Sequence, residues 1–148
     1  MQPIAPKENS QIAWLLSGDI SIRYQTTRDL LKDNQTRLQN RISMEGWGRQ
    51  YFDCRNPNGT WGKAFYQPKW TCTHYTLLEL KKLQIAPTTQ GLLDVIMHIT
   101  DQHISRDGGI GHRPGCKKSD VCINGMFLNY ACYFGVPEQS LHSVIDFL

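Results

Sequence analysis

Gly59-Thr60-Trp61-Gly62 recurs as Gly108-Gly109-Ile110-Gly111, 49 residues further along the chain. The residues after each copy are also similar in type, and the matched pairs are Thr73 with Cys122, Leu77 with Met126, Leu78 with Phe127, Leu92 with Leu141, Val95 with Val144 and Ile96 with Ile145. A fixed period of this length indicates that one supersecondary unit has been copied. Such a unit buries its apolar face against its neighbour, so the repeat predicts an array of similar units packed side by side.

Apolar residues recur at helical spacing, and no stretch of useful length alternates with the period of two that is typical of strands. We therefore predict an all-α fold of about three helical hairpins. The predicted helices cover about residues 11–16, 22–31, 36–52, 71–83, 89–103, 119–134 and 138–148. Asn9 or Ser10 is the predicted cap of the first helix and Ser21 that of the second. Gly46 and Gly48 favour a break in the third.

The repeated turn has a structural explanation. Glycine readily adopts the positive φ angles of tight turns, and a tryptophan supplies a large apolar body that can wedge between hairpins. We interpret six turn residues in this structural way: Gly59, Trp61, Gly62, Gly108, Gly109 and Gly111.

Length and composition are typical of one globular domain. The chain has 148 residues, of which 40% are hydrophobic and 20% are charged, which is enough apolar material for a core. Residues 1–8 contain two prolines and no periodic pattern, so they are predicted to be a loose leader. Residues 9–148 are predicted to form a single helical-repeat domain.

Charge and cysteine content exclude several classes of protein. The net charge is +3, from 16 basic and 13 acidic residues that are scattered along the chain, which argues against nucleic-acid binding. No apolar run approaches the roughly 18 residues of a transmembrane helix, and the first residues lack the apolar region of a signal peptide. The five cysteines form no C-x-x-C pair, which favours reduced thiols in a cytoplasmic protein over disulfides or a zinc finger.

The first copy resembles a repeat of the prenyltransferase and squalene-cyclase family. The resemblance rests on Asn58-Gly59-Thr60-Trp61-Gly62, on Lys69-Trp70-Thr71-Cys72-Thr73 and on the aliphatic helix that follows. Asp107-Gly108-Gly109-Ile110-Gly111 is similar to the next copy, with isoleucine in place of the aromatic residue. Covering about residues 10–148, the resemblance implies an α/α toroid, in which hairpins form two concentric rings around a cavity. The chain corresponds to about half of a complete toroid, either an N-terminal half or a truncated one.

The resemblance also implies a metal site. In protein prenyltransferases, an aspartate and a cysteine with D-x-C spacing at the start of a helix bind zinc together with a distant histidine. Asp120 and Cys122 match this motif by type, spacing and position. His112 and Cys116 are nearby substitutes for the missing histidine, although no motif supports them. In the alternative interpretation, Asp120 caps a helix and Cys122 is a small buried residue.

Two functions stay open. As a terpene cyclase- or prenyltransferase-like protein, the chain would bind an isoprenoid or another apolar ligand against Trp70, Tyr75 and Tyr130, whose rings can stabilise a carbocation. An enzyme of this kind would be a transferase or isomerase, but the acidic D-x-D-D and D-D-x-x-D motifs that form the cation are absent from the sequence. Alternatively, the chain is a non-catalytic helical-repeat module that binds a partner protein or forms a homodimer through its open C-terminal edge.

Overall fold

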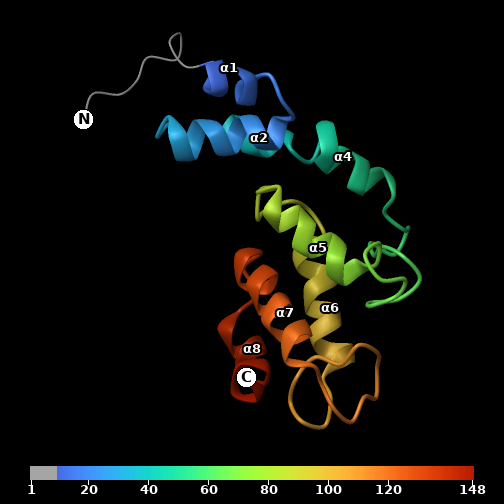
Figure 1. Cartoon of the computed structure of the whole chain (residues 1–148). Coiled ribbons are helices and arrows are strands. Elements are labelled where there is room, and N and C mark those ends of the chain that lie inside the picture. Colours follow the sequence, from blue (N-terminus) through green and yellow to red (C-terminus); the bar gives the residue numbers. More distant parts are fainter. Residues whose placement is uncertain (1–9) are drawn as a thin grey trace. The chain divides into compact units, whose positions relative to one another are not determined.

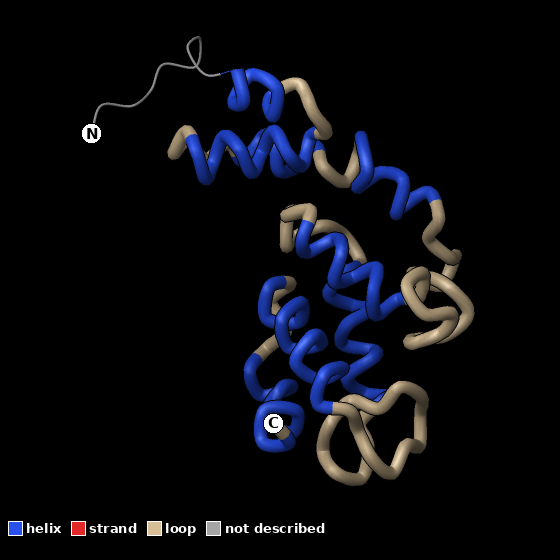
Figure 2. The backbone as a smooth tube through the Cα atoms, viewed as in Figure 1, coloured by secondary structure: helices blue, strands red, loops and turns tan. Residues whose placement is uncertain are grey.

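The computed structural model describes residues 10–148, which form helices joined by loops (Figure 2). In chain order the elements are α1 (Ser10–Leu16), α2 (Ile20–Gln25), the π-helix η1 (Thr26–Leu30), α3 (Thr36–Arg41), α4 (Gly46–Asp53), α5 (Thr73–Lys82), α6 (Leu92–His103), α7 (Val121–Tyr133) and α8 (Glu138–Phe147). The all-α prediction is confirmed, and the toroid stays a prediction. The predicted leader and Asn9 lie outside the described residues.

None of the described helices has the length and apolar character needed to cross a membrane. The sequence predicts one domain over residues 9–148, whereas the structure groups the described residues into two compact units. The first unit consists of the described residues up to Asp53 together with Lys82–Ala86, and the second consists of Cys54–Lys81 and Pro87–Leu148. Figure 1 labels α1, α2 and α4 of the first unit and α5 to α8, which lie largely in the second.

Asp19 organises the helix starts of the first unit. Its Oδ1 atom accepts hydrogen bonds from the backbone nitrogen (2.9 Å) and the hydroxyl (2.7 Å) of Ser21, and Oδ2 accepts one from the backbone nitrogen of Trp47 at 2.8 Å. Asp19 is therefore the cap of α2, and the prediction of Ser21 is wrong, because the carboxylate can accept several N–H and O–H bonds at once. The predicted break in the third helix is confirmed: α3 ends at Arg41 and α4 begins at Gly46, whose φ is +62°.

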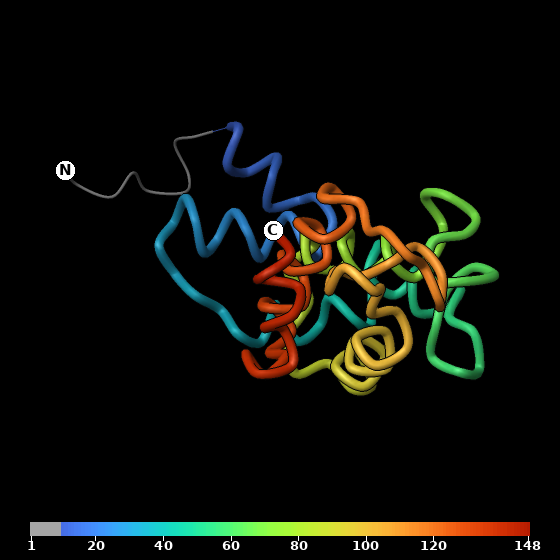
Figure 3. The backbone as a smooth tube through the Cα atoms, turned by 90° about the horizontal axis from the view of Figure 1, so that it is seen from below, coloured from blue at the N-terminus to red at the C-terminus, as the bar shows by residue number. Residues whose placement is uncertain are grey.

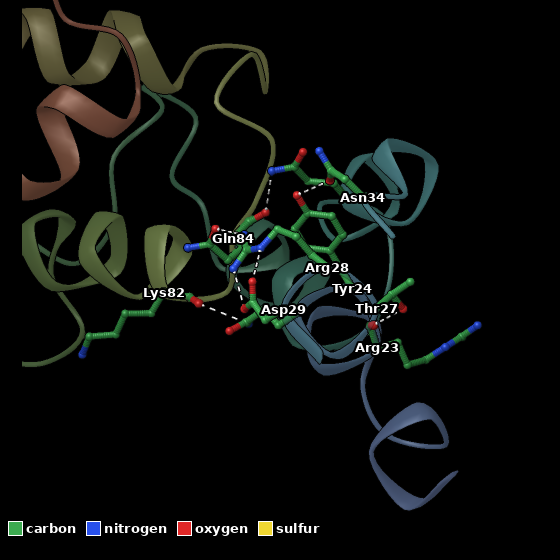
Figure 4. A network of polar contacts seen from close by, with 10 residues as sticks. Arg23, Tyr24, Thr27, Arg28, Asp29, Asn34, Lys82 and Gln84 are labelled. Carbon is green, nitrogen blue, oxygen red and sulfur yellow. Dashed lines mark hydrogen bonds and ion pairs between the residues drawn. The ribbon is translucent and has the colours of Figure 1, made fainter. Parts of the chain in front are cut away.

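Polar contacts hold the segment Lys82–Ala86 within the first unit (Figure 4). The Gln25 side chain donates to the backbone oxygen of Lys82 at 3.3 Å, and the Gln39 side chain donates to that of Gln84 at 3.2 Å. The Gln84 side chain accepts a further bond from the Arg28 guanidinium. Side chains from three separate elements thus satisfy the backbone and side-chain oxygens of this short segment.

The two glycine turns of the second unit, residues 56–62 and 105–111, share a backbone hydrogen bond and a glycine of positive φ, although Gly62 has φ of +71° and its counterpart Gly111 has no positive φ. In both, the first amide donates to the carbonyl of the fifth residue at 2.8 Å. Gly59 and Gly108 occupy equivalent positions with φ of +83° and +92°, a region that side chains disfavour. The structural interpretation of these glycines is therefore supported, and the turns keep the period of 49 residues.

A side chain from the following helix clamps each turn. Thr73 Oγ1 donates to the backbone oxygen of Trp61 and accepts from its nitrogen, both at 2.9 Å. In the second copy, Asn124 Oδ1 accepts from the nitrogen of Ile110 at 2.6 Å, and Asn124 Nδ2 donates to its oxygen at 3.1 Å. The counterpart of Thr73 is therefore Asn124, and the predicted match with Cys122 is wrong, because Thr73 follows its turn residue Trp61 by 12 positions, whereas Asn124 follows Ile110 by 14.

The same displacement carries through the first helix of each copy. It invalidates the predicted matches of Leu77 with Met126 and of Leu78 with Phe127. With the displacement, Thr76 corresponds to Phe127 and Leu80 to Ala131, and all four are buried. The period of 49 returns in the second helix, where the matched and buried pairs are Leu92 with Leu141 and Val95 with Val144. There α8 packs against α6 and α7 (Figure 3).

Trp61 is 2% exposed, and the Arg55 guanidinium lies 5.1 Å from the centre of its indole ring. We predict that Trp61→Ala lowers the free energy of unfolding by about 3–5 kcal/mol, because it removes a buried ring and leaves a cavity. Trp70 is 68% exposed in the same unit and packs only one face on Tyr75, so Trp70→Ala should change it by about 1 kcal/mol or less. Denaturant unfolding measures both changes, and equal effects would contradict the wedge interpretation.

Candidate functional site

Two of the three predicted ligand residues lie together in the structure. The rings of Trp70 and Tyr75 have their centres 4.7 Å apart. Trp70 is mostly exposed, and Tyr75 is 7% exposed beneath it. Tyr130 is fully buried, so it lies below this surface rather than on it.

Trp70 combines two unfavourable features. Its indole is 68% exposed, and its backbone has φ of +76°, a conformation that is a true outlier for a bulky residue. Strain of this kind costs about 1–3 kcal/mol and is concentrated at functional sites. The Lys69 ammonium lies 5.0 Å from the centre of the indole ring, so a cation accompanies the exposed aromatic face.

Tyr66 extends the pair into a cluster. Its hydroxyl lies 2.9 Å from that of Tyr75, and the two ring centres are 5.5 Å apart. This hydrogen bond raises the pKa of Tyr66 well above its usual value, and burial acts in the same direction. We call Tyr66, Trp70 and Tyr75 the aromatic surface. Nothing in the sequence pattern distinguishes Tyr66, since no signal pairs two tyrosines nine residues apart.

His74 fills the space beneath the aromatic surface. It is fully buried, and its ring contacts four aromatic rings at centre distances of 5.2–5.6 Å: those of Phe65, Tyr66, Tyr75 and Tyr130. Nδ1 lies 3.2 Å from the Tyr130 hydroxyl, whereas Nε2 has no hydrogen-bond partner within residues 10–148. Burial lowers the pKa of His74 from 6.5 to about 4, so the imidazole is neutral at neutral pH. The sequence gives no signal for this histidine, because only its aromatic neighbours in the folded protein distinguish it.

The predicted zinc ligands lie at the start of α7, where both are exposed. Asp120 occupies the N-cap position without a side-chain cap bond, and its backbone oxygen accepts two bonds from Asn124. The substitutes His112 and Cys116 contact each other, with 3.6 Å between Nδ1 and Sγ. No group of three or more histidine, cysteine or acidic side chains in residues 10–148 is arranged to hold a metal ion. Because a catalytic zinc needs three protein ligands, the described residues do not fit zinc.

The burial of His74 predicts that the free energy of unfolding depends on pH. The unfolded chain binds this proton below about pH 6.5, whereas the native protein binds it only below about pH 4. The free energy of unfolding therefore has its full value above pH 6.5. As the pH decreases to 4, protonation of His74 in the unfolded chain lowers it by about 3 kcal/mol. The His74→Phe variant lacks this group. Between pH 7 and pH 4 its free energy of unfolding should therefore fall by about 3 kcal/mol less than that of the wild type. A wild-type slope in His74→Phe would refute the assignment.

Comparison with known proteins leaves the family of this chain open. The sequence matches no protein-family model and no curated protein, and the structure matches no solved structure, at a significant level. The resemblance to the prenyltransferase and squalene-cyclase family therefore rests on the two glycine turns and the helices that follow them.

Proposed function

We propose that the aromatic surface of Tyr66, Trp70 and Tyr75 binds an apolar ligand of the isoprenoid class. The observation that carries the proposal is the exposure of the Trp70 indole on a backbone of positive φ. Folding alone would favour a glycine or a small polar residue here, because the indole gains little burial and the backbone is strained. A ligand that covers the indole would supply the missing burial.

The chemistry of the surface favours a prenyl chain over a polar ligand. The hydroxyls of Tyr66 and Tyr75 are bonded to each other, so the cluster offers ring faces rather than free polar groups. Ring faces attract methyl groups and double bonds through dispersion and suit a developing carbocation. The proposal is for binding by a cyclase- or prenyltransferase-like protein, and the chemistry of the bound chain stays unassigned.

Calorimetric titration with farnesol tests the proposal. Burying the Trp70 ring should contribute enough that Trp70→Ala weakens binding by about tenfold or more. Trp14 and Trp47 are 73% and 49% exposed and lie in the first unit, so Trp14→Ala and Trp47→Ala are matched controls that should bind like the wild type. Tyr75→Phe keeps the ring and should retain most of the affinity. No saturable binding by the wild type, or an equal loss in all three tryptophan variants, would refute the proposal.

A second candidate function is self-association through α8. Ile96 on α6 is fully buried, whereas Ile145, at the same position of the second copy, is 45% exposed. Leu148 is also exposed, at 53%. The face that is covered on α6 is thus bare on α8, and a second copy of the chain can cover it with the same apolar residues.

Self-association makes its own prediction. The wild-type chain should increase in mass with concentration in light scattering, and Ile145→Asp should remain a monomer, because a carboxylate in an apolar interface is costly. The Ile145→Asp variant should still bind farnesol, since the aromatic surface is not altered. A wild-type chain that is monomeric at every concentration would eliminate this candidate and leave the ligand proposal intact.

A further inference from the structure

A separate pocket of about 280 Å³ lies within the second unit, between the first glycine turn and α6. Its wall includes Lys63, Asp94, His98, Ile99 and His103, together with Phe65, whose ring also contacts His74. His98 and His103 both line this pocket. Asp94 and His98 lie on the same side of α6 because they are four residues apart.

In the second copy of the repeat, the equivalent groove between the glycine turn and α8 is closed. At the positions equivalent to Asp94 and His98 it has Ser143 and Phe147. A β-carbon added to Gly109 would lie 2.9 Å from Phe147 Cδ1, so the phenyl ring packs directly on the turn. Ser143 Oγ donates to the Gly108 oxygen at 2.8 Å. The same turn-to-helix groove is therefore filled in the second copy, whereas the first copy has an open pocket with ionisable residues.

His103 presents a hydrogen-bond acceptor in this pocket. Its Nδ1 atom lies 3.2 Å from the backbone oxygen of Gly111. Since a carbonyl can only accept, Nδ1 carries the proton and Nε2 carries the lone pair. Burial lowers the pKa of His103, which keeps the imidazole neutral. The ring of Phe65 packs against it with 4.8 Å between centres, so an apolar wall adjoins the acceptor.

Two opposite charges complete the lining. Lys63 and Asp94 are both exposed and line the pocket. Within residues 10–148 neither forms an ion pair, and the Asp94 carboxylate also acts electrostatically on the Arg55 guanidinium. A bare cation or a bare anion would be attracted by one of these groups and repelled by the other. A ligand that carries both charges satisfies both groups.

We propose that this pocket binds a small zwitterion with an apolar side chain, namely an aliphatic amino acid. Its ammonium group would be held by the Asp94 carboxylate and His103 Nε2, and its carboxylate by the Lys63 ammonium. Its side chain would lie against Phe65 and Ile99. The pocket volume of about 280 Å³ is just below the roughly 300 Å³ at which ligand pockets usually start. This volume suits a single amino acid.

Titration calorimetry with L-leucine, isoamylamine and 4-methylpentanoate tests the charge requirement. L-Leucine should bind at least about tenfold more tightly than either analogue, because each analogue leaves one charged group without its partner. Asp94→Asn and Lys63→Gln should each weaken L-leucine binding by about tenfold or more. Asp101→Asn changes another exposed carboxylate of α6 that does not line the pocket, and it should bind like the wild type. Equal binding of L-leucine and either analogue, or no binding of L-leucine, would overturn the proposal.

The internal repeat supplies a second test. His98→Phe introduces the residue that closes the groove in the second copy, so it should abolish L-leucine binding. Thr60 stands in the first copy where the second copy has Gly109, so the double variant Thr60→Gly/His98→Phe reproduces the closed groove, and its melting temperature shows whether the fold is intact. L-Leucine binding by a folded His98→Phe variant would overturn the proposal. Farnesol titration of the same variant keeps this result separate from the proposed function, since the aromatic surface is unchanged.

Discussion

The hydrogen bonds from Thr73 to Trp61 and from Asn124 to Ile110 are the constraint on which the second unit depends. A buried turn has amide and carbonyl groups that no helix or sheet pairs, and leaving them unpaired is costly. One side chain with both a donor and an acceptor satisfies the pair in each copy. Because that side chain belongs to the next helix, the clamp fixes the turn against α5 or α7. The open pocket and the aromatic surface both lie next to the first of these clamps.

The helices and the turns were predictable from the sequence because each depends on local signals. Apolar spacing located α5 to α8 to within a few residues, and the glycines located both turns. The register of the repeat was not predictable in the same way. Helical apolar residues recur every three or four positions, so a displacement of two still pairs many apolar residues, Leu78 with Phe127 among them. The clamp residues that reveal the displacement differ in type, threonine in one copy and asparagine in the other.

The sites were predictable only in part, for a related reason. Trp70 and Tyr75 were expected together and are together, since five residues across a helix start bring them close. Two features depend on the assembled fold: the positive φ of Trp70 and the burial of His74 among four rings. The pocket occurs in the first copy of the repeat and not in the second. Only a comparison of the two folded copies shows this, because the groove beside His98 is open and the equivalent groove is filled by Phe147.

Native-state hydrogen exchange of the Trp61 and Ile110 amides tests the clamp most directly. The account predicts that both amides exchange only when the second unit unfolds, as slowly as the core amides of α6 and α7, because each is bonded to a buried side chain. Exchange of either amide at the fast rate of an exposed loop amide, such as that of Lys117, would contradict it. In that case the repeated turns would not be held by Thr73 and Asn124.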